Sequence, residues 1–212
     1  MRPSIPTSDL LDAAASVIVD RGFSGVRMDA VAARAGVAKG VPYGRFASKQ
    51  ELLLAVIDRE LVEAIRHAAR LVADDPEGGR FSRLWLHSSA ALASRPVLVR
   101  LYVDPDSPLP AAAEARRDRL DARALLGAEF IRDLQRADLV DPHLNAAALA
   151  TNLTLWNYGL AAREPGENNH DLIAGMAGLL ARGADTGRGD LEEGKALFAA
   201  FAERLIEDRS LS

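Results

Sequence analysis

Two short helical segments joined by a glycine-containing turn constrain the fold of this chain more than any other feature of its sequence. The first is predicted from Met28 to Ala35, because apolar side chains recur there at helical spacing. Gly36 and Val37 form the turn, and residues 38–46 form the second segment. Two short helices in this arrangement are typical of a helix-turn-helix, whose second helix enters the major groove of DNA.

A longer amphipathic helix precedes this pair and is predicted to end at Gly22. Glycine tolerates the positive φ at which many helices end, and Phe23 is expected to pack back against the helix. The sequence therefore predicts a three-helix domain over residues 1–47. The apolar face of its first helix consists of Leu10, Leu11, Ala14, Ala15 and Ile18.

The remainder of the chain has the same helical character. Turn-forming clusters divide the 212 residues into about ten helical segments, without the apolar–polar alternation of strands. Aromatic residues make up only 5% of the chain, which also disfavours sheet. We therefore expect an all-α protein. Helix caps are predicted at Ser48 with Glu51, at Asp190 with Glu193, and at Asp141 ahead of Pro142.

Charge and composition narrow the functional classes. Residues 1–50 carry seven basic and four acidic side chains, whereas the whole chain has a net charge of −4. A locally basic module on an acidic body suits a nucleic-acid backbone, since counterion release depends on local contacts. No apolar stretch is long enough to span a bilayer and the N-terminal segment lacks the pattern of a signal peptide, so we expect a cytoplasmic protein.

An enzyme is the main alternative class. The histidines at positions 67, 87, 143 and 170 have no metal-ligand spacing, and the chain has no cysteine. No nucleophile elbow or phosphate-binding glycine loop is present. Asp104 and Asp106 lie in a proline-rich turn that is typical of a solvated loop. We therefore expect no catalytic residue, no metal site and no cofactor.

Short motifs at fixed spacing fill the run from Leu10 to Asp58. They are paired alanines, a Gly-aromatic pair, an apolar-Ala pair, Ala-Gly-Val, Lys-Gly-x-x-Tyr-x-x-Phe and Ser-Lys-x-x-Leu. The residues that carry them are Ala14, Ala15, Gly22, Phe23, Val31, Ala32, Ala35, Gly36, Val37, Lys39, Gly40, Tyr43, Phe46, Ser48, Lys49 and Leu52. In this run the chain resembles the TetR family of bacterial regulators. The resemblance implies a DNA-binding regulator, by default a repressor, whose residues 48–212 form a helical ligand-binding and dimerisation domain.

The expected DNA contacts lie on the second short segment and beside it. Lys39 can reach a phosphate or a guanine edge, and Tyr43 a phosphate oxygen. Lys49 lies in the first turn of the next helix, where the helix dipole already favours a phosphate. The alternatives are that Tyr43 packs in the core and that Lys49 is only solvated. The full predicted set is Arg27, Ala38, Lys39, Gly40, Val41, Pro42, Tyr43, Arg45 and Lys49.

Several of these positions depart from the family pattern. Ala38 and Arg27 each replace a hydroxyl cap, and Val41 replaces a small hydroxyl residue; losing a hydroxyl cap costs about 1 kcal/mol. Pro42 falls at the fourth position of the second helix, where proline removes an early hydrogen bond. We therefore predict a shortened or distorted recognition helix.

The segment from Pro142 to Ala162 carries two apolar seams. Such a helix is covered on two sides, by its own core and by something else. With the last helix, Asp190–Arg209, it would form a symmetric four-helix dimer interface, which places two DNA-binding domains about 34 Å apart on a palindromic operator. A fully buried monomer helix is the alternative. The predicted interface residues are Leu144, Ala148, Thr151, Leu155, Tyr158, Phe198, Phe201 and Leu205.

A small-molecule effector is expected to bind among the middle helices, where large and polar side chains interleave. The ligand releases DNA only if it prefers the DNA-incompetent geometry. The alternative is a dimeric helical DNA-binding or interaction module with a filled core and no induction. The predicted effector contacts, each of which could instead be core, are Phe81, Trp85, His87, Tyr102, Phe130, Asn152 and Trp156.

Overall fold

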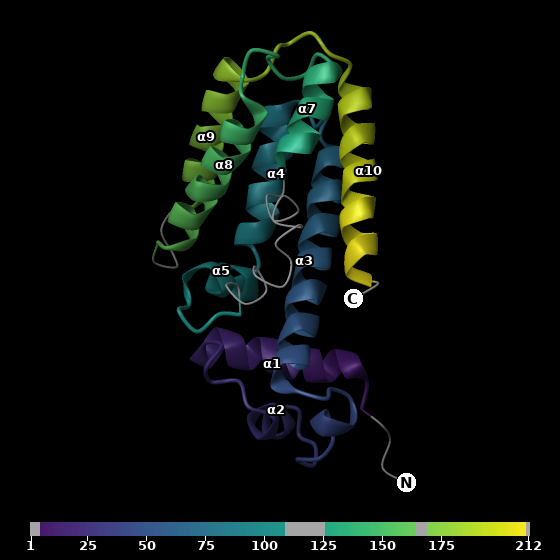
Figure 1. The fold of residues 1–212 in the computed structure, drawn as a ribbon, viewed down its shortest axis with the longest axis vertical. Coiled ribbons are helices and arrows are strands. Elements are labelled where there is room, and N and C mark those ends of the chain that lie inside the picture. The colour runs from purple at the N-terminus through teal and green to yellow at the C-terminus, as the bar shows by residue number, and fades with distance from the viewer. Residues whose placement is uncertain (1–4, 109–125, 164–168, 211–212) are drawn as a thin grey trace. The chain divides into compact units, whose positions relative to one another are not determined.

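The computed structural model describes residues 5–108, 126–163 and 169–210, and the regular secondary structure in these ranges is helical, apart from one isolated bridge between Val140 and Asp185 (Figure 1). The all-α prediction is therefore confirmed. The described residues form two compact units: the chain up to Leu61 with residues from Arg95 to 108, and Val62–Ser94 with the residues from 126 onward. None of the helices in these ranges has the length and apolarity to cross a bilayer.

The first unit is built around α1, which packs against α2 and α5, while α2 packs against η1. Buried side chains from different elements, such as Ile18, Val31 and Leu52, form its core. The elements are α1 (Thr7–Arg21), α2 (Met28–Arg34), the 3-10 helix η1 (Pro42–Gly44), the part of α3 (Lys49–Asp74) up to Leu61, and α5 (Pro96–Val103).

The end of α1 follows the sequence prediction. Gly22 has a φ of +71°, and its N–H donates to the carbonyl of Ile18. Phe23 is almost completely buried, as predicted from its position after the helix. A Cβ atom on Gly22 would also lie 2.5 Å from Oδ2 of Asp104, so both the backbone and a neighbouring side chain require glycine here.

The second segment of the predicted helix-turn-helix contains a 3-10 turn in place of a regular α-helix. Pro42 begins this turn, and the N–H groups of Gly44 and Arg45 donate to carbonyls three residues earlier, those of Val41 and Pro42, at 3.2 and 3.1 Å. Proline has no N–H to give to an α-helical hydrogen bond at this position. The prediction that the second helix is shortened or distorted is therefore confirmed, and the missing N–H of Pro42 accounts for it.

The start of α3 is fixed by a capping box. The N–H of Glu51 donates to Oγ of Ser48 at 3.1 Å, and the N–H of Ala47 donates to the Glu51 carboxylate at 2.6 Å. This confirms the cap predicted from the spacing of Ser48 and Glu51. The cap holds the backbone between the 3-10 turn and α3.

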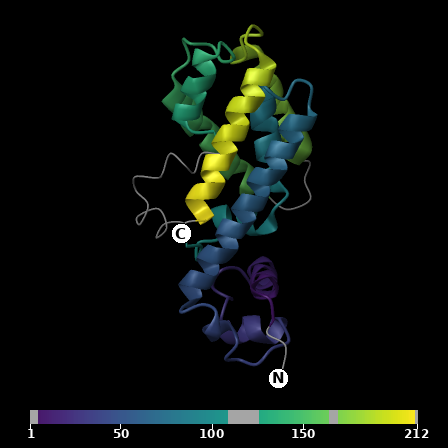
Figure 2. The same ribbon diagram turned by 90° about the vertical axis from the view of Figure 1, so that its right-hand side faces the viewer.

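The second unit is a helical body with an aromatic-rich core. α4 packs on α9, and α7 packs on α8 and α10. The rings of Phe130 and Phe201 stack at 4.5 Å, and those of Trp85 and Trp156 meet edge to face at 5.0 Å. Figures 1 and 2 both show α10 alongside α3, where Ile65 packs with residues of α10. Besides the rest of α3, the elements are α4 (Phe81–Ala93), α7 (Ala128–Arg136), α8 (Ala146–Ala161), α9 (Asn169–Gly183) and α10 (Leu191–Ser210).

The predicted start of α8 is wrong, whereas the predicted start of α10 is confirmed. α8 begins at Ala146, where the side chain of Asn145 accepts from the N–H of Ala148, and not at Pro142. Asp141 instead accepts from the N–H of His143 within a turn at 2.9 Å, because its carboxylate satisfies the backbone locally. Asp190 does precede α10 and accepts from the N–H of Glu192.

Candidate nucleic-acid interface

Basic side chains of the first unit gather around a surface hollow of about 600 Å³. The hollow is lined by the start of α2, the 3-10 turn and the start of α3. Two lysines and an arginine contribute to it, with Asp29 as the acidic member. Its lining consists of Ser24, Val26, Arg27, Met28, Asp29, Lys39, Tyr43 and Lys49.

Local structure positions each of these groups. Arg27 occupies the extended cap position before α2, makes no side-chain cap hydrogen bond and is exposed. Tyr43 lies on η1 with 63% of its surface exposed, which excludes the alternative that it packs in the core. Lys49 is the first residue of α3, where the helix dipole attracts anions.

Charge separates this hollow from the rest of the first unit. Arg34 is paired with Asp20, and Arg59 with Asp12, each at 2.6 Å. The side chains of Arg27, Lys39 and Lys49, by contrast, form no hydrogen bond or ion pair with any residue in the described ranges. Three uncompensated cations therefore gather around one hollow, which is the arrangement that a polyanion would recognise.

The remaining members of the predicted DNA-binding set surround the hollow without lining it. Ala38, Gly40 and Arg45 are exposed, whereas Val41 is half-buried. Pro42 is buried, so its ring supports the turn and does not face a ligand. Phe46 is buried, in agreement with its predicted place in the core.

Residues of α5 and those on either side of it secure α1 and α3 of the first unit, and the sequence did not reveal these contacts. Oδ2 of Asp104 accepts from the N–H of Phe23 at 2.8 Å, and Arg100 donates to the carbonyl of Val19 at 2.9 Å. Both pairs are separated by 81 positions in the chain. The buried carboxylate of Glu60 adds a third tie, because it binds Arg95 at 3.2 Å. No local pattern in the sequence signals these pairings, and Asp104 had been assigned to a solvated loop.

The predicted effector residues do not all come together. Phe81, Trp85, Phe130 and Trp156 belong to the core of the second unit or pack against it. His87 bonds Asp75 through Nε2 at 2.8 Å. Asn152 is exposed on α8, and Tyr102 lies on α5 in the first unit.

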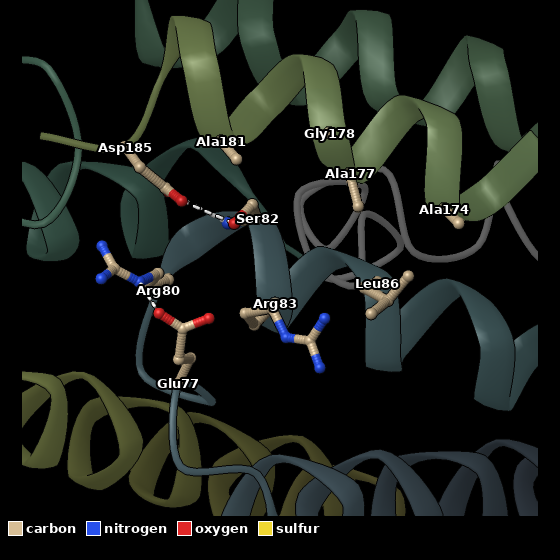
Figure 3. A pocket seen from close by; sticks show the side chains of 10 residues that line it. All are labelled: Glu77, Arg80, Ser82, Arg83, Leu86, Ala174, Ala177, Gly178, Ala181 and Asp185. Atoms are coloured by element: carbon tan, nitrogen blue, oxygen red, sulfur yellow. Dashed lines mark hydrogen bonds and ion pairs between the residues drawn. The ribbon is translucent and has the colours of Figure 1, made fainter. Parts of the chain in front are cut away.

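A pocket of about 400 Å³ in the second unit lies between α4 and α9, and none of those seven residues lines it. Figure 3 shows its lining residues, among them Arg80 and Arg83. The local sequence carried no sign of this pocket, because its walls come from helices almost a hundred positions apart.

The predicted dimer residues divide between surface and core. Ala148, Thr151, Leu155 and Tyr158 are exposed on α8. Phe198 and Leu205 are buried inside the second unit, so the surface of α10 that is open to a partner does not include them. Their side chains contact Phe130 and the α3 residue Ile65, which explains the burial. Leu144 and Phe201 are partly buried against the core.

Comparison with known proteins identifies the family of this chain. The family model for bacterial regulatory proteins of the tetR family matches residues 10–56. Over 69 residues the chain is 49% identical to the HTH-type transcriptional activator FasR of Mycolicibacterium smegmatis, which covers 31% of this chain and only 32% of FasR. It is 30% identical over 171 residues to an uncharacterized HTH-type transcriptional regulator of Mycobacterium tuberculosis, covering 68% of this chain and 88% of that protein.

A solved structure shares the fold. AibR in complex with isovaleryl coenzyme A and operator DNA superposes with a TM-score of 0.59 at 18% identity, over 81% of this chain and 96% of AibR. At this identity the likeness concerns the fold alone. From the family match around the basic hollow and the 30% identical relative, we conclude that this chain belongs to the TetR family and is a DNA-binding transcriptional regulator, not an enzyme.

Proposed function

We propose that this regulator binds a palindromic operator as a homodimer and that a small molecule releases it from DNA. The observation that carries the DNA contacts is the hollow where Arg27, Lys39 and Lys49 are unpaired beside the exposed ring of Tyr43. The three cations would bind phosphates, and the hydroxyl of Tyr43 would add a phosphate contact. Lys39 is also free to reach a guanine edge.

Exposed apolar side chains support the homodimer. In the described part of the second unit, every large apolar side chain that is exposed lies on α8 or α9: Leu155, Tyr158, Leu172 and Leu179. Leu155 and Leu179 expose 61% and 59% of their surface, and such groups mark interfaces when they gather on neighbouring faces. The proposed interface therefore keeps α8 and takes α9 in place of the buried face of α10.

Two buried polar atoms without a hydrogen-bond partner support the proposal that a small-molecule effector binds the second unit. Nε1 of Trp85 and Oγ of Ser88 are buried one turn apart on α4, and neither has a hydrogen-bond partner in the described ranges. A buried donor without a partner costs about 1–3 kcal/mol. A ligand with a carbonyl or carboxylate group would satisfy both. In AibR the same fold is found with an acyl coenzyme A and with DNA.

The direction of regulation is proposed as repression. The relative FasR is an activator by its name, so whether this regulator represses or activates needs its own measurement. A reporter under the bound promoter, with and without the regulator, would give it. Lower expression with the regulator supports repression, and higher expression overturns it.

Footprinting on the DNA that flanks the gene tests the proposal. A protected palindrome is expected at low salt, and its absence would overturn operator binding. Lys49→Ala should weaken binding on every sequence and reduce the salt slope by about 1, because one phosphate contact is lost. Lys195→Ala is the matched control, since Lys195 pairs with Glu192 on α10. Protection that no small molecule changes would favour a dimeric DNA-binding module without induction.

A further inference from the structure

The pocket between α4 and α9 has one apolar wall and one charged rim. Figure 3 shows α9 along one side, where four small residues line the pocket: Ala174, Ala177, Gly178 and Ala181. Leu86 of α4 adds an apolar side chain, and Arg83 of α4 lies on the opposite rim with Arg80, the residue before α4. Two carboxylates also line the pocket, and each has a partner: Glu77 pairs with Arg80, and Asp185 accepts from the hydroxyl of Ser82. At about 400 Å³, the space falls within the range of small-molecule sites.

Arg83 is a cation held in a fixed place. Its Nε donates to Oδ2 of Asp75 at 2.6 Å. The same carboxylate accepts from Nε2 of His87 at 2.8 Å and from the N–H of Glu77 at 2.9 Å, and its side chain is only 10% exposed. Because the carboxylate of Asp75 accepts three hydrogen bonds, it is fixed, and it restricts the side-chain conformations of Arg83. A ligand that binds this arginine therefore loses little side-chain entropy.

The terminal nitrogens of both rim arginines remain open to a ligand. Arg83 is anchored through Nε alone, and Arg80 is anchored in the same way to Glu77 at 3.0 Å. In Figure 3 the two guanidinium groups extend in opposite directions, and that of Arg83 extends toward Leu86. One carboxylate therefore meets one arginine, and Arg83 is the arginine beside the apolar residues. Arginine binds a carboxylate through two parallel N–H groups.

We propose that this pocket binds a small planar aromatic carboxylate, with the carboxylate on the terminal nitrogens of Arg83 and the ring against α9. A flat wall without side chains beyond Cβ favours a planar ring over a branched chain. A carboxylate fits because Asp75 holds Arg83 through Nε and leaves its two terminal nitrogens as parallel donors. This site is separate from the operator contacts and from Trp85 and Ser88.

Calorimetric titration of the full-length protein with 2-naphthoate tests the site in the absence of DNA. We expect saturable binding of one 2-naphthoate per chain, with neutral 2-naphthamide at least about tenfold weaker. Arg83→Gln should weaken 2-naphthoate by about tenfold or more. Arg136→Gln should leave it unchanged, since Arg136 is an exposed arginine of α7 that pairs with Asp133.

A second variant keeps the test independent of Arg83. Gly178→Leu should block the ring site, and a Cβ atom at this position meets only Arg182, at an ordinary 3.8 Å, so the helix can accept it. Ala199→Leu, on the exposed face of α10, is its control. Unchanged binding in both Arg83→Gln and Gly178→Leu would overturn the proposal, as would displacement by equimolar inorganic phosphate. Neither result bears on operator binding, which is measured separately.

Discussion

The two units of this regulator are stabilised by different kinds of contact. In the first unit, polar groups join segments that are far apart in the chain: Asp104 to Phe23, and Arg100 to Val19. In the second unit, a large apolar cluster joins the helices, and the aromatic rings around Phe130 lie at its centre. A short N-terminal core is thus completed by hydrogen bonds from α5, whereas the body relies on buried apolar area.

The difference determines how each unit responds to the substitution of a single residue. Apolar burial is spread over many residues, so the loss of one leaves a cavity but not an unpaired group. A hydrogen bond to the backbone has one donor and one acceptor, and removal of the acceptor leaves the donor unsatisfied. The unit that carries the proposed DNA-binding surface therefore depends on a few polar residues outside the helix-turn-helix run.

The largest effect is expected from a cavity in the second unit. Leu84 is completely buried on α4, and Leu84→Ala should lower the free energy of unfolding by about 2–5 kcal/mol. Urea unfolding followed by tryptophan fluorescence measures it, because Trp85 and Trp156 both belong to this unit. Leu54→Ala, at an exposed position of the first unit, should cost less than about 1 kcal/mol. Equal costs for the two leucines would remove the contrast between core and surface.

A smaller and more local effect is expected in the first unit. Asp104→Ala removes the acceptor for the N–H of Phe23 and should destabilise the end of α1 by about 1–3 kcal/mol. Hydrogen exchange at Val17 and Ile18 should accelerate, while amides of the second unit keep their protection. Asp106→Ala is the control, because its carboxylate has no hydrogen bond to any residue that the structure describes. Faster exchange in both variants would show that loop charge, and not the Phe23 bond, is responsible.

In the first unit, the features that depend only on residues adjacent in the sequence were predictable. The helix end at Gly22, the distortion at Pro42 and the cap at Ser48 each follow from the backbone chemistry of one residue. The partners of Asp104 and Arg100 were not predictable, because their acceptors and donors lie 81 positions away. The exposure of Lys39 and Tyr43 follows from the same local run. That both line one hollow could not be predicted, because the hollow forms only when several elements pack together.

In the second unit, helical periodicity predicted that segments are helices but not which face each one buries. Leu155 and Phe198 both lie on apolar seams, yet one is exposed and the other is buried. Asn145 and Asp141 are both good caps, and only the packing of α8 on α7 decides which begins the helix. The pocket beside Arg83 depends on the approach of α9 to α4, which no local pattern specifies.

The smallest expected effect is a change of stability with pH that depends on the charge of Asp75. It tests the comparison between the units because Asp75 is a hydrogen-bonded carboxylate in the unit that relies mainly on apolar burial. Burial alone raises the pKa of Asp75, but hydrogen bonds from His87, the N–H of Glu77 and Arg83, with the charge of Arg83, lower it from 3.8 to about 2. Because the folded pKa is below the unfolded value, the ionised carboxylate stabilises the fold above about pH 4, and this contribution is lost as the pH falls toward 2.

Asp75→Asn lacks this contribution at every pH. The difference in urea midpoint between the unmodified protein and Asp75→Asn should be constant above about pH 4 and should shrink between pH 4 and pH 2. Asp138→Asn is the matched control: a hydrogen bond from Arg188 lowers the pKa of Asp138, but the pair is exposed and screened by water. Asparagine also tolerates the φ of +56° at this position. If Asp138→Asn showed the larger pH dependence, the buried position of Asp75 would not be what makes its charge matter.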